Sequence, residues 1–368
     1  MKICYVITKA DEIGGAQIHI RDLSKSLLKD GHTPVVITGE KGLLVDYLYE
    51  MGIEVYVVND LQRSISIKKD IRALWKILKV LKRVKPDIVS LHSSKAGALG
   101  RIACALLNIK VIFTAHGWAF ANGVDEKEKK KYIRIEKFLS RFANKIITVS
   151  KQDKNLAIKY KVASEHRQVV IHNGMYDLPI ESERNLSERS SDICNLVMVA
   201  RFSEQKDHKT LFKALEQLRN EKWHLHLIGK GPGLEENIKL VESLNLSNKI
   251  TFLGERNDVD KYLLKMDIFL LIANWEGFPR SILEAMRSSL PIIASDVGGV
   301  SEAINDAING YLIPRGDSDL LTERLKNLIQ DKGLRASIGV RNRADYIKYF
   351  TFEAMYRKTL QLYLEVTK

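Results

Sequence analysis

Two glutamates stand eight residues apart in the segment EGFPRSILE, residues 276–284, and their spacing raises the first question of chemistry. Pro279 disfavours a helical conformation at the residue before it, so the sequence predicts a helix that begins near Arg280. Glu276 would then lie on a loop at a strand end, and Glu284 in the first turns of the helix. A carboxylate accepts hydrogen bonds from neighbouring hydroxyl groups, so two carboxylates in one cleft suit a ligand with a polyol at each end. A nucleoside-diphosphate sugar has this shape.

Two cations, Arg201 and Lys206, follow an apolar run in the segment VMVARFSEQKDH. A diphosphate leaving group needs its charge neutralised as the bond to it breaks, by a metal ion or by fixed Arg and Lys side chains. A pair of solvated surface residues is the alternative in a chain this basic. The position just after a strand favours a role in ligand binding.

A pair of glycines, Gly14 and Gly15, occupies the first strand-to-helix junction, TKADEIGGAQIHI. Without side chains they would let backbone N–H groups approach an anionic ligand at the start of a helix, although an ordinary turn explains such a pair equally well. The dinucleotide pattern GxGxxG and the pattern GxxxxGK[ST] are absent at this junction, which disfavours a nicotinamide site or a P-loop.

No group of His, Asp and Glu stands at metal-ligand spacing along the chain, and no metal or cofactor is predicted. The Asp-x-Asp pairs at 258/260 and 317/319 each precede an apolar helical run, where helix capping is the expected role. The three cysteines stand singly in apolar surroundings and are expected to be buried and reduced, as in a cytosolic protein.

Short apolar runs alternate with amphipathic segments along the chain, which predicts an α/β fold with parallel sheets covered by helices. Residues 181–192 hold one apolar residue and interrupt this pattern, which then restarts. We therefore predict two Rossmann-like domains that face each other across a cleft, at 1–180 and 181–350. A helix at 351–368 follows and could cross back to the first domain.

The net charge of +13 belongs to the first half of the chain, since residues 1–180 carry 31 Lys and Arg against 18 Asp and Glu. Much of it lies in the segment 67–84, whose Ile67, Ile71, Leu74, Leu78 and Leu81 fall at helical spacing among basic residues. One interpretation is a core-facing helix with a solvated basic face. The other is a helix that docks on an anionic membrane surface. No signal peptide or membrane span is visible.

Several of these motifs together resemble those of a known family. The segments EGFPRSILEAM, LPIIASDVGGVSE, VARFSEQKD, IGGAQ, HNG and NGYLIP resemble the large family 4 of retaining glycosyltransferases with two Rossmann domains, the GT-B fold. Within that family, TKADEIGGAQ and TAHGWAFANG resemble bacterial enzymes that build O-antigen and capsule repeat units. The motifs run from about residue 3 to 315 and so cover most of the chain.

The resemblance implies roles for individual residues. Glu284 would hold the ribose, and Glu276 and His116 would lie beside the transferred sugar; a buried structural histidine is the alternative for His116. The catalytic residues would be Glu276, His116, Arg201 and Lys206. Residues that bind the sugar donor would be Gly15, Arg201, Lys206, Gly254, Glu276, Gly277, Phe278, Pro279, Arg280 and Glu284, with Gly229 near the base. Residues that bind the acceptor would be Gly14, Gly15 and His116.

The reaction implied is transfer of a hexose or N-acetylhexosamine, most simply from a UDP-sugar, to a lipid-diphosphate-linked saccharide. It would proceed with retention and without metal, and Glu276 as a covalent nucleophile stays open. The enzyme would work at the cytoplasmic face of the inner membrane, with its basic half on anionic lipid. Two alternatives remain. One is a nucleotide-sugar epimerase or synthase of the same fold, and the other is a nucleic-acid-binding protein, for which no binding signature is visible.

Overall fold

The computed structural model describes residues 1–10, 14–121, 124–178 and 192–368, and its elements follow the alternation in the sequence. The predicted linker at 181–192 and the domain boundary at 180 lie almost entirely outside the described residues. Within these ranges the chain divides into two compact units. The first unit holds Met1–Asn173 and Met355–Lys368, and the second holds Gly174–Ala354.

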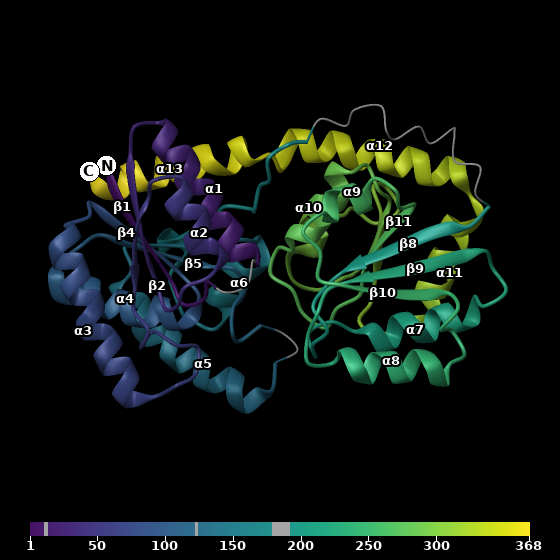
Figure 1. Cartoon of the computed structure of the whole chain (residues 1–368), viewed down its shortest axis with the longest axis horizontal. Coiled ribbons are helices and arrows are strands. Elements are labelled where there is room, and N and C mark those ends of the chain that lie inside the picture. The colour runs from purple at the N-terminus through teal and green to yellow at the C-terminus, as the bar shows by residue number, and fades with distance from the viewer. Residues whose placement is uncertain (11–13, 122–123, 179–191) are drawn as a thin grey trace. The chain divides into compact units, whose positions relative to one another are not determined.

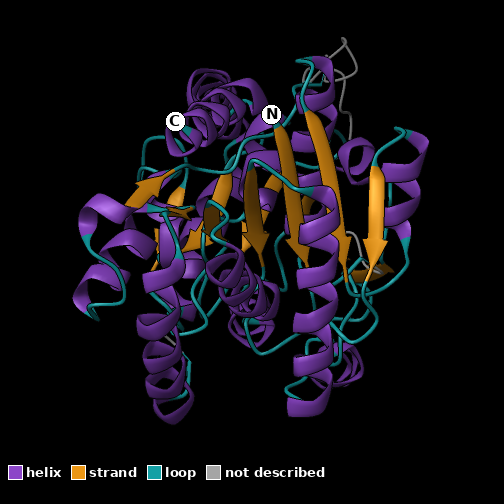
Figure 2. Cartoon of the chain, turned by 90° about the vertical axis from the view of Figure 1, so that its left-hand side faces the viewer, coloured by secondary structure: helices purple, strands orange, loops and turns teal. Residues whose placement is uncertain are grey.

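The first unit is built on a seven-stranded sheet of order β3-β2-β1-β4-β5-β6-β7. All its described strand pairs are parallel, and helices flank the strands (Figure 2). The strands are β1 (Lys2–Ile7), β2 (Thr33–Thr38), β3 (Glu54–Val57), β4 (Ile88–His92), β5 (Val111–Ala115), β6 (Lys145–Thr148) and β7 (Gln168–Val170). The helices are α1 (Gly15–Lys29), α2 (Leu43–Glu50), α3 (Ile67–Val84), α4 (Ser94–Leu107), α5 (Glu126–Leu139), α6 (Lys151–Lys159) and α13 (Phe352–Thr367).

The second unit repeats this plan with a six-stranded parallel sheet of order β10-β9-β8-β11-β12-β13 (Figure 1). Its strands are β8 (Cys194–Val199), β9 (Trp223–Ile228), β10 (Ile250–Gly254), β11 (Ile268–Leu271), β12 (Ile292–Ser295) and β13 (Tyr311–Ile313). Its helices are α7 (His208–Gln217), α8 (Leu234–Ser243), α9 (Val259–Leu263), α10 (Arg280–Arg287), α11 (Ser318–Gln330) and α12 (Lys332–Tyr349). The predicted α/β fold with two Rossmann-like domains is confirmed.

Each unit has its own hydrophobic core. Helices cover both faces of its sheet, and strands buried on both faces are mainly apolar. β4 is buried at every position, as are β11 and β12. The three cysteines are free and buried, as predicted, and burial raises the pKa of Cys104 and of Cys194 to about 12. At neutral pH these two thiols are therefore protonated side chains of the core.

The final helix, α13, belongs to the first unit through its contacts. The Tyr363 hydroxyl donates a hydrogen bond to Ser90 on β4, and the Tyr356 hydroxyl donates one to Asp30 after α1. Thr367 near the end of α13 contacts Met1. In Figure 1 the chain ends therefore lie side by side next to β1.

The basic helix α3 buries only part of the apolar set that the sequence places at helical spacing. Its buried residues are Ala73, Ile77, Leu81 and Val84. Ile67 and Ile71, which the spacing assigns to the apolar face, are 76% and 53% exposed. The core-facing interpretation therefore does not hold for these two residues, which form with Trp75, 63% exposed, a second apolar stripe on the helix.

The two Asp-x-Asp pairs also differ in their roles. Asp317 caps α11 as predicted, since its carboxylate accepts from the backbone N–H of Leu320 at 2.9 Å. Asp258 precedes α9 but binds Arg256 instead of a backbone N–H group, and Asp260 pairs with Arg287. Asp258 and Asp260 thus stand at the predicted N-cap and first-turn positions of α9, but their carboxylates pair with arginine side chains.

Candidate functional site

The candidate site of the second unit lies where the strand order of its sheet reverses. Strands β8 and β11 are neighbours in that sheet, and the chain runs outward from them in opposite directions. Loops beyond the carboxyl ends of two such strands diverge and leave a crevice, the usual ligand position in an open α/β sheet. Arg201 and Lys206 follow β8, and Glu276 follows β11. The fold thus brings to one edge side chains that stand about 70 residues apart.

Lys206 and Glu276 form an ion pair across this reversal point. Their side chains are only 11% and 7% exposed. A buried charge is costly unless an opposite charge or hydrogen bonds compensate it, so each of the two ions depends on the other. The pair also places a cation and a carboxylate at one point of the crevice. Arg201 nearby is exposed, in contrast to Lys206.

Backbone contacts hold the loop that carries Glu276. The Gln205 side chain donates to the carbonyl of Trp275 at 2.9 Å, and the Gly299 N–H donates to the carbonyl of Gly277 at 2.6 Å. Gly298 has φ +61°, and a Cβ atom built on it would lie 1.9 Å from the carbonyl oxygen of Glu276. A glycine is required there on both counts. The segment after β12 therefore fixes the backbone beneath Glu276.

Helix α10 begins at Arg280, as predicted from Pro279, and carries Glu284 in its second turn. Among the residues that the structure describes, none donates a hydrogen bond to the Glu284 carboxylate. Burial raises the pKa of Glu284, and the positive charges of Arg280 and Arg287 offset this only in part. A partly buried carboxylate with open acceptor positions is suited to hydroxyl donors.

The other donor-binding residues that were predicted in the second unit lie at or near the carboxyl ends of β10 and β11. Phe278 is buried, and the Arg280 guanidinium donates to the carbonyl of Gly174 at 3.3 Å. Gly254 ends β10 with φ +67°, and its carbonyl accepts from the N–H of Gly229. Gly277 and Pro279 complete the turn between β11 and α10.

In the first unit, the strand order reverses between β1 and β4. Gly14 and Gly15 precede and open α1, which follows β1, and α1 has no acidic residue in its first turn. A helix N-terminus without a competing carboxylate favours anions. His116 directly follows β5, the neighbour of β4. The predicted acceptor residues thus lie at the carboxyl edge of one sheet.

Three histidines meet at this edge, and two of them were not predicted. His19 on α1 and His92 at the end of β4 are buried, and the rings of both lie within 5.5 Å of the His116 ring centre. Burial, together with the charge of His116, lowers the pKa of His92 well below its usual value. Each stands at a strand end or in the first turns of the following helix, but no spacing along the sequence shows that they converge.

These three histidines could hold a metal ion, because one ring nitrogen of each lies within 4.8 Å of the others. Spacing along the sequence did not reveal this group, because its members come from three separate elements. The nitrogens already contact one another, since His92 Nδ1 lies 2.9 Å from His116 Nε2. A metal ion would have to replace that hydrogen bond.

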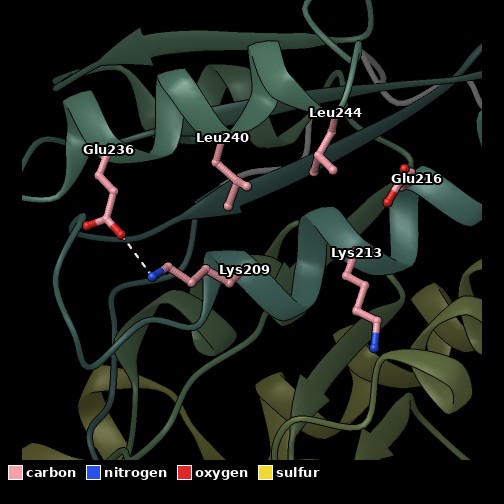
Figure 3. Close-up of a pocket in the computed structure, with 6 residues that line it drawn as sticks. All are labelled: Lys209, Lys213, Glu216, Glu236, Leu240 and Leu244. Atoms are coloured by element: carbon pink, nitrogen blue, oxygen red, sulfur yellow. Dashed lines mark ion pairs between the residues drawn. The ribbon is translucent and has the colours of Figure 1, made fainter.

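A separate surface pocket lies between α7 and α8 (Figure 3). Its lining residues are Lys209, Lys213, Glu216, Glu236, Leu240 and Leu244, and none of them is a predicted site residue. Figure 3 shows Lys209 and Glu236 reaching across it as an ion pair, and they lie 2.8 Å apart. Both side chains are about 70% exposed, so this pair is a solvent-screened counterpart of Lys206 and Glu276.

Two Rossmann-like units in one chain are the architecture of the GT-B class of glycosyltransferases. The chain belongs to the glycosyltransferases: residues 13–176 match the family model "Glycosyltransferase Family 4" and residues 181–345 match "Glycosyl transferases group 1". The resemblance seen in the sequence is thereby confirmed.

Among curated proteins, the UDP-Gal:alpha-D-GlcNAc-diphosphoundecaprenol alpha-1,3-galactosyltransferase of Escherichia coli is 31% identical over 313 residues, which are 81% of this chain and 80% of that protein. The O-antigen biosynthesis glycosyltransferase WbnH of Escherichia coli is 30% identical over 86% of this chain and 87% of its own length. HepE of Anabaena, solved with UDP-glucose, shares the fold with a TM-score of 0.84 and 22% identity, over 98% of this chain and 99% of that one.

Proposed function

We propose that this glycosyltransferase moves a hexose or N-acetylhexosamine from a UDP-sugar to a lipid-diphosphate-linked saccharide, with retention of anomeric configuration, in the synthesis of a bacterial surface polysaccharide. The observation that carries the proposal is the buried Lys206–Glu276 pair at the reversal point of the second sheet. Its cation can neutralise a departing diphosphate, and its carboxylate can accept hydroxyl groups of the sugar.

The rest of the site supports the same reaction. Arg201 adds a second positive charge at the carboxyl end of β8, and Glu284 offers a carboxylate for the ribose hydroxyls. With fixed cations for the diphosphate, the transfer requires no metal ion. We assign Glu276 to the sugar as a hydrogen-bond acceptor, since a carboxylate held by Lys206 is a weaker nucleophile than an unpaired one.

The acceptor is inferred from the relatives and from the first unit. The Escherichia coli galactosyltransferase and a Campylobacter jejuni N-acetylgalactosaminyltransferase that is 26% identical both carry names that specify diphosphoundecaprenol-linked acceptors. Such a lipid lies in the membrane, and the first unit carries the excess positive charge of the chain. We therefore place the enzyme at the cytoplasmic face of the membrane, on anionic lipid. Among the described helices, none is long and apolar enough to cross a bilayer.

Product analysis tests this function. The purified protein is incubated with UDP-Gal, UDP-Glc, UDP-GalNAc or UDP-GlcNAc and a short-chain polyprenyl-diphosphate-linked GlcNAc or GalNAc, with and without excess EDTA. We expect an α-linked disaccharide from one of these donors, at equal rates in both conditions. A β-linked product or a requirement for added metal contradicts the mechanism. An epimerised sugar formed from the donor alone would favour the epimerase alternative.

We expect the affinity for the sugar donor to depend on pH through Glu284. Ribose hydroxyls hydrogen-bond best to the ionised carboxylate, so donor binding favours ionisation of Glu284, whose pKa burial raises in the free protein. Affinity should then rise with pH until Glu284 is ionised, by up to about tenfold per pH unit below its pKa. Calorimetric titration with UDP-Gal between pH 5 and 8 measures this, because its diphosphate diester does not titrate there.

The matched variant is Glu284→Gln, which keeps the shape and removes the charge. We expect weaker binding and a flat pH profile for this variant. A variant with wild-type affinity would exclude the assignment of Glu284 to the ribose.

We expect the exposed stripe of α3 to bind anionic membranes. Ile67, Ile71 and Trp75 follow one another at intervals of four residues on the solvent side of the helix, and Lys68 and Lys79 flank them. Apolar side chains inside a basic face suit the interface of an anionic bilayer. The double change Ile71→Ser and Trp75→Ser should lower the fraction that co-sediments with phosphatidylglycerol vesicles by roughly fivefold or more.

Val340→Ser is the control, since Val340 on α12 is 68% exposed but lies in the second unit. It should leave sedimentation unchanged. Lys79→Glu should weaken binding to anionic vesicles and reduce its sensitivity to salt. Equal binding of wild type and the double variant would show that α3 is a solvated surface helix.

A further inference from the structure

A chain of hydrogen-bonding side chains links the C-terminal helix to His116 inside the first unit. The Tyr363 hydroxyl on α13 donates to Ser90 Oγ at 2.9 Å, and Ser90 Oγ lies 3.1 Å from His92 Nε2. His92 Nδ1 in turn lies 2.9 Å from His116 Nε2. The contacts bring together α13, β4 and the residue after β5, although Tyr363 and Ser90 stand 273 residues apart.

Burial determines which atom donates and which accepts in each of these hydrogen bonds. Ser90 and His92 have no exposed surface, so each of their polar hydrogens needs an acceptor within the protein. Ser90 Oγ accepts the Tyr363 hydrogen, and among the described residues His92 Nε2 is the acceptor that contacts Ser90 Oγ. A neutral imidazole has one donor nitrogen and one acceptor nitrogen, so His92 carries its proton on Nδ1. His92 therefore donates to His116 Nε2.

We propose that Tyr363, Ser90 and His92 are positioning residues that fix the tautomer of His116, so that His116 presents Nδ1–H as a hydrogen-bond donor to an oxygen of the substrate. The tautomer follows from the first unit alone. The statement that His116 faces the substrate rests on the proposed function.

This tautomer gives His116 a specific place in the reaction. Its Nε2 lone pair is occupied by His92, and its Nδ1 already carries a proton, so a neutral His116 does not remove the proton from the acceptor hydroxyl. It can hold a sugar or phosphate oxygen in position. Deprotonation of the acceptor then falls to the departing diphosphate, a path that is compatible with the proposed retention of configuration.

NMR of the full-length protein labelled with ¹⁵N-histidine tests the tautomer without any assay of activity. Among the nine histidines, the signals of His92 and His116 are assigned by the loss of one signal set in each of His92→Gln and His116→Gln. We expect the ring proton on Nδ1 for both His92 and His116 in the wild type. A proton on Nε2 of His116 overturns the proposal, whether or not the protein transfers a sugar.

The variant Tyr363→Phe tests the contribution of the helix, because it keeps the aromatic ring and removes only the hydroxyl. We expect changed ring ¹⁵N shifts for His92 and His116 and, in the transfer assay, a kcat about tenfold lower with little change in KM, the effect of losing one buried hydrogen bond. Ser90→Ala should act in the same direction.

The matched control is Tyr356→Phe on the same helix, whose hydroxyl donates to Asp30 at the surface. It should leave both the histidine signals and kcat at wild-type values. If Tyr363→Phe leaves the His116 signals and kcat unchanged, Tyr363 is a packing residue and the proposal fails.

A titration with Zn²⁺ provides an independent check. A metal ion held by His19, His92 and His116 would need an unprotonated His92 Nδ1, which the proposed tautomer excludes. We expect that the wild type has no stoichiometric Zn²⁺ site that depends on His92. The wild type and His92→Gln should therefore behave alike in the titration. Stoichiometric binding that depends on His92, with loss of the Nδ1–H signal of His92, would show that these histidines are a metal site instead.

Discussion

Replacing Lys206 with alanine should lower kcat for sugar transfer by roughly two to three orders of magnitude, the cost of removing one fixed charge from a developing anion. The same change should destabilise the second unit. It leaves the Glu276 carboxylate, which is 7% exposed, without its counter-ion, and breaking a buried pair from one side costs about 3–5 kcal/mol. Urea unfolding and single-turnover kinetics with saturating UDP-sugar measure the two effects separately.

Lys209→Ala is the matched control for this prediction. Lys209 is also a lysine paired with a glutamate in the same part of the chain, but its partner Glu236 and its own side chain are about 70% exposed (Figure 3). Solvent screens that pair, so neither activity nor stability should change measurably. Glu276→Gln is a further test, because it removes the carboxylate charge but keeps an oxygen that accepts a hydrogen bond from Lys206. A Lys206→Ala variant with activity within threefold of the wild type would remove Lys206 from the mechanism.

Much of the second unit could be predicted because the signals for it are local. Pro279 restricts the residue before it, and this alone places Glu276 on a loop and Glu284 on a helix. Arg201 and Lys206 follow a strand in the sequence, and residues after parallel strands share one edge of the sheet. The contact between Lys206 and Glu276 is not local, since it depends on β8 and β11 being neighbours. It could be expected only as a consequence of the fold class.

The histidine cluster shows where local signals end. His19 lies on α1, His92 ends β4, and His116 follows β5. Taken separately, each has the pattern of an ordinary buried histidine. Their meeting follows from the strand order β1-β4-β5. The hydroxyl of Tyr363 adds a partner from the end of the chain. No periodicity in the sequence contains this information.

The apolar residues of α3 show a different limit of prediction from sequence. The helix carries apolar residues on two stripes, and periodicity identifies each stripe without showing which one faces the sheet. Ala73, Ile77 and Leu81 are the buried set. Small Ala73 permits close packing on the neighbouring elements, whereas Ile67 and Ile71 lie nearer the start of the helix on its solvent side. Tertiary packing, rather than helical propensity, decides between the two.

We expect Gly298→Ala to reduce both stability and activity although Gly298 itself offers no side chain for catalysis. Its φ of +61° costs a non-glycine residue about 1–2 kcal/mol. The new Cβ atom would in addition lie 1.9 Å from the carbonyl oxygen of Glu276, a separation that atoms cannot adopt, so the Glu276 loop must move. A shift of about 1 Å in a catalytic group can lower the rate by about a hundredfold.

Gly316→Ala separates these two costs. Gly316 has φ +78°, and a Cβ atom built on it meets nothing within 4 Å. This variant should show the backbone cost alone, as a modest loss in urea unfolding with wild-type kcat. Gly298→Ala should lose more stability and most of its kcat, since only this change displaces Glu276. Equal losses of stability in the two variants, with kcat preserved in both, would show that the loop adapts without moving the carboxylate, and that the support from Gly298 has no part in catalysis.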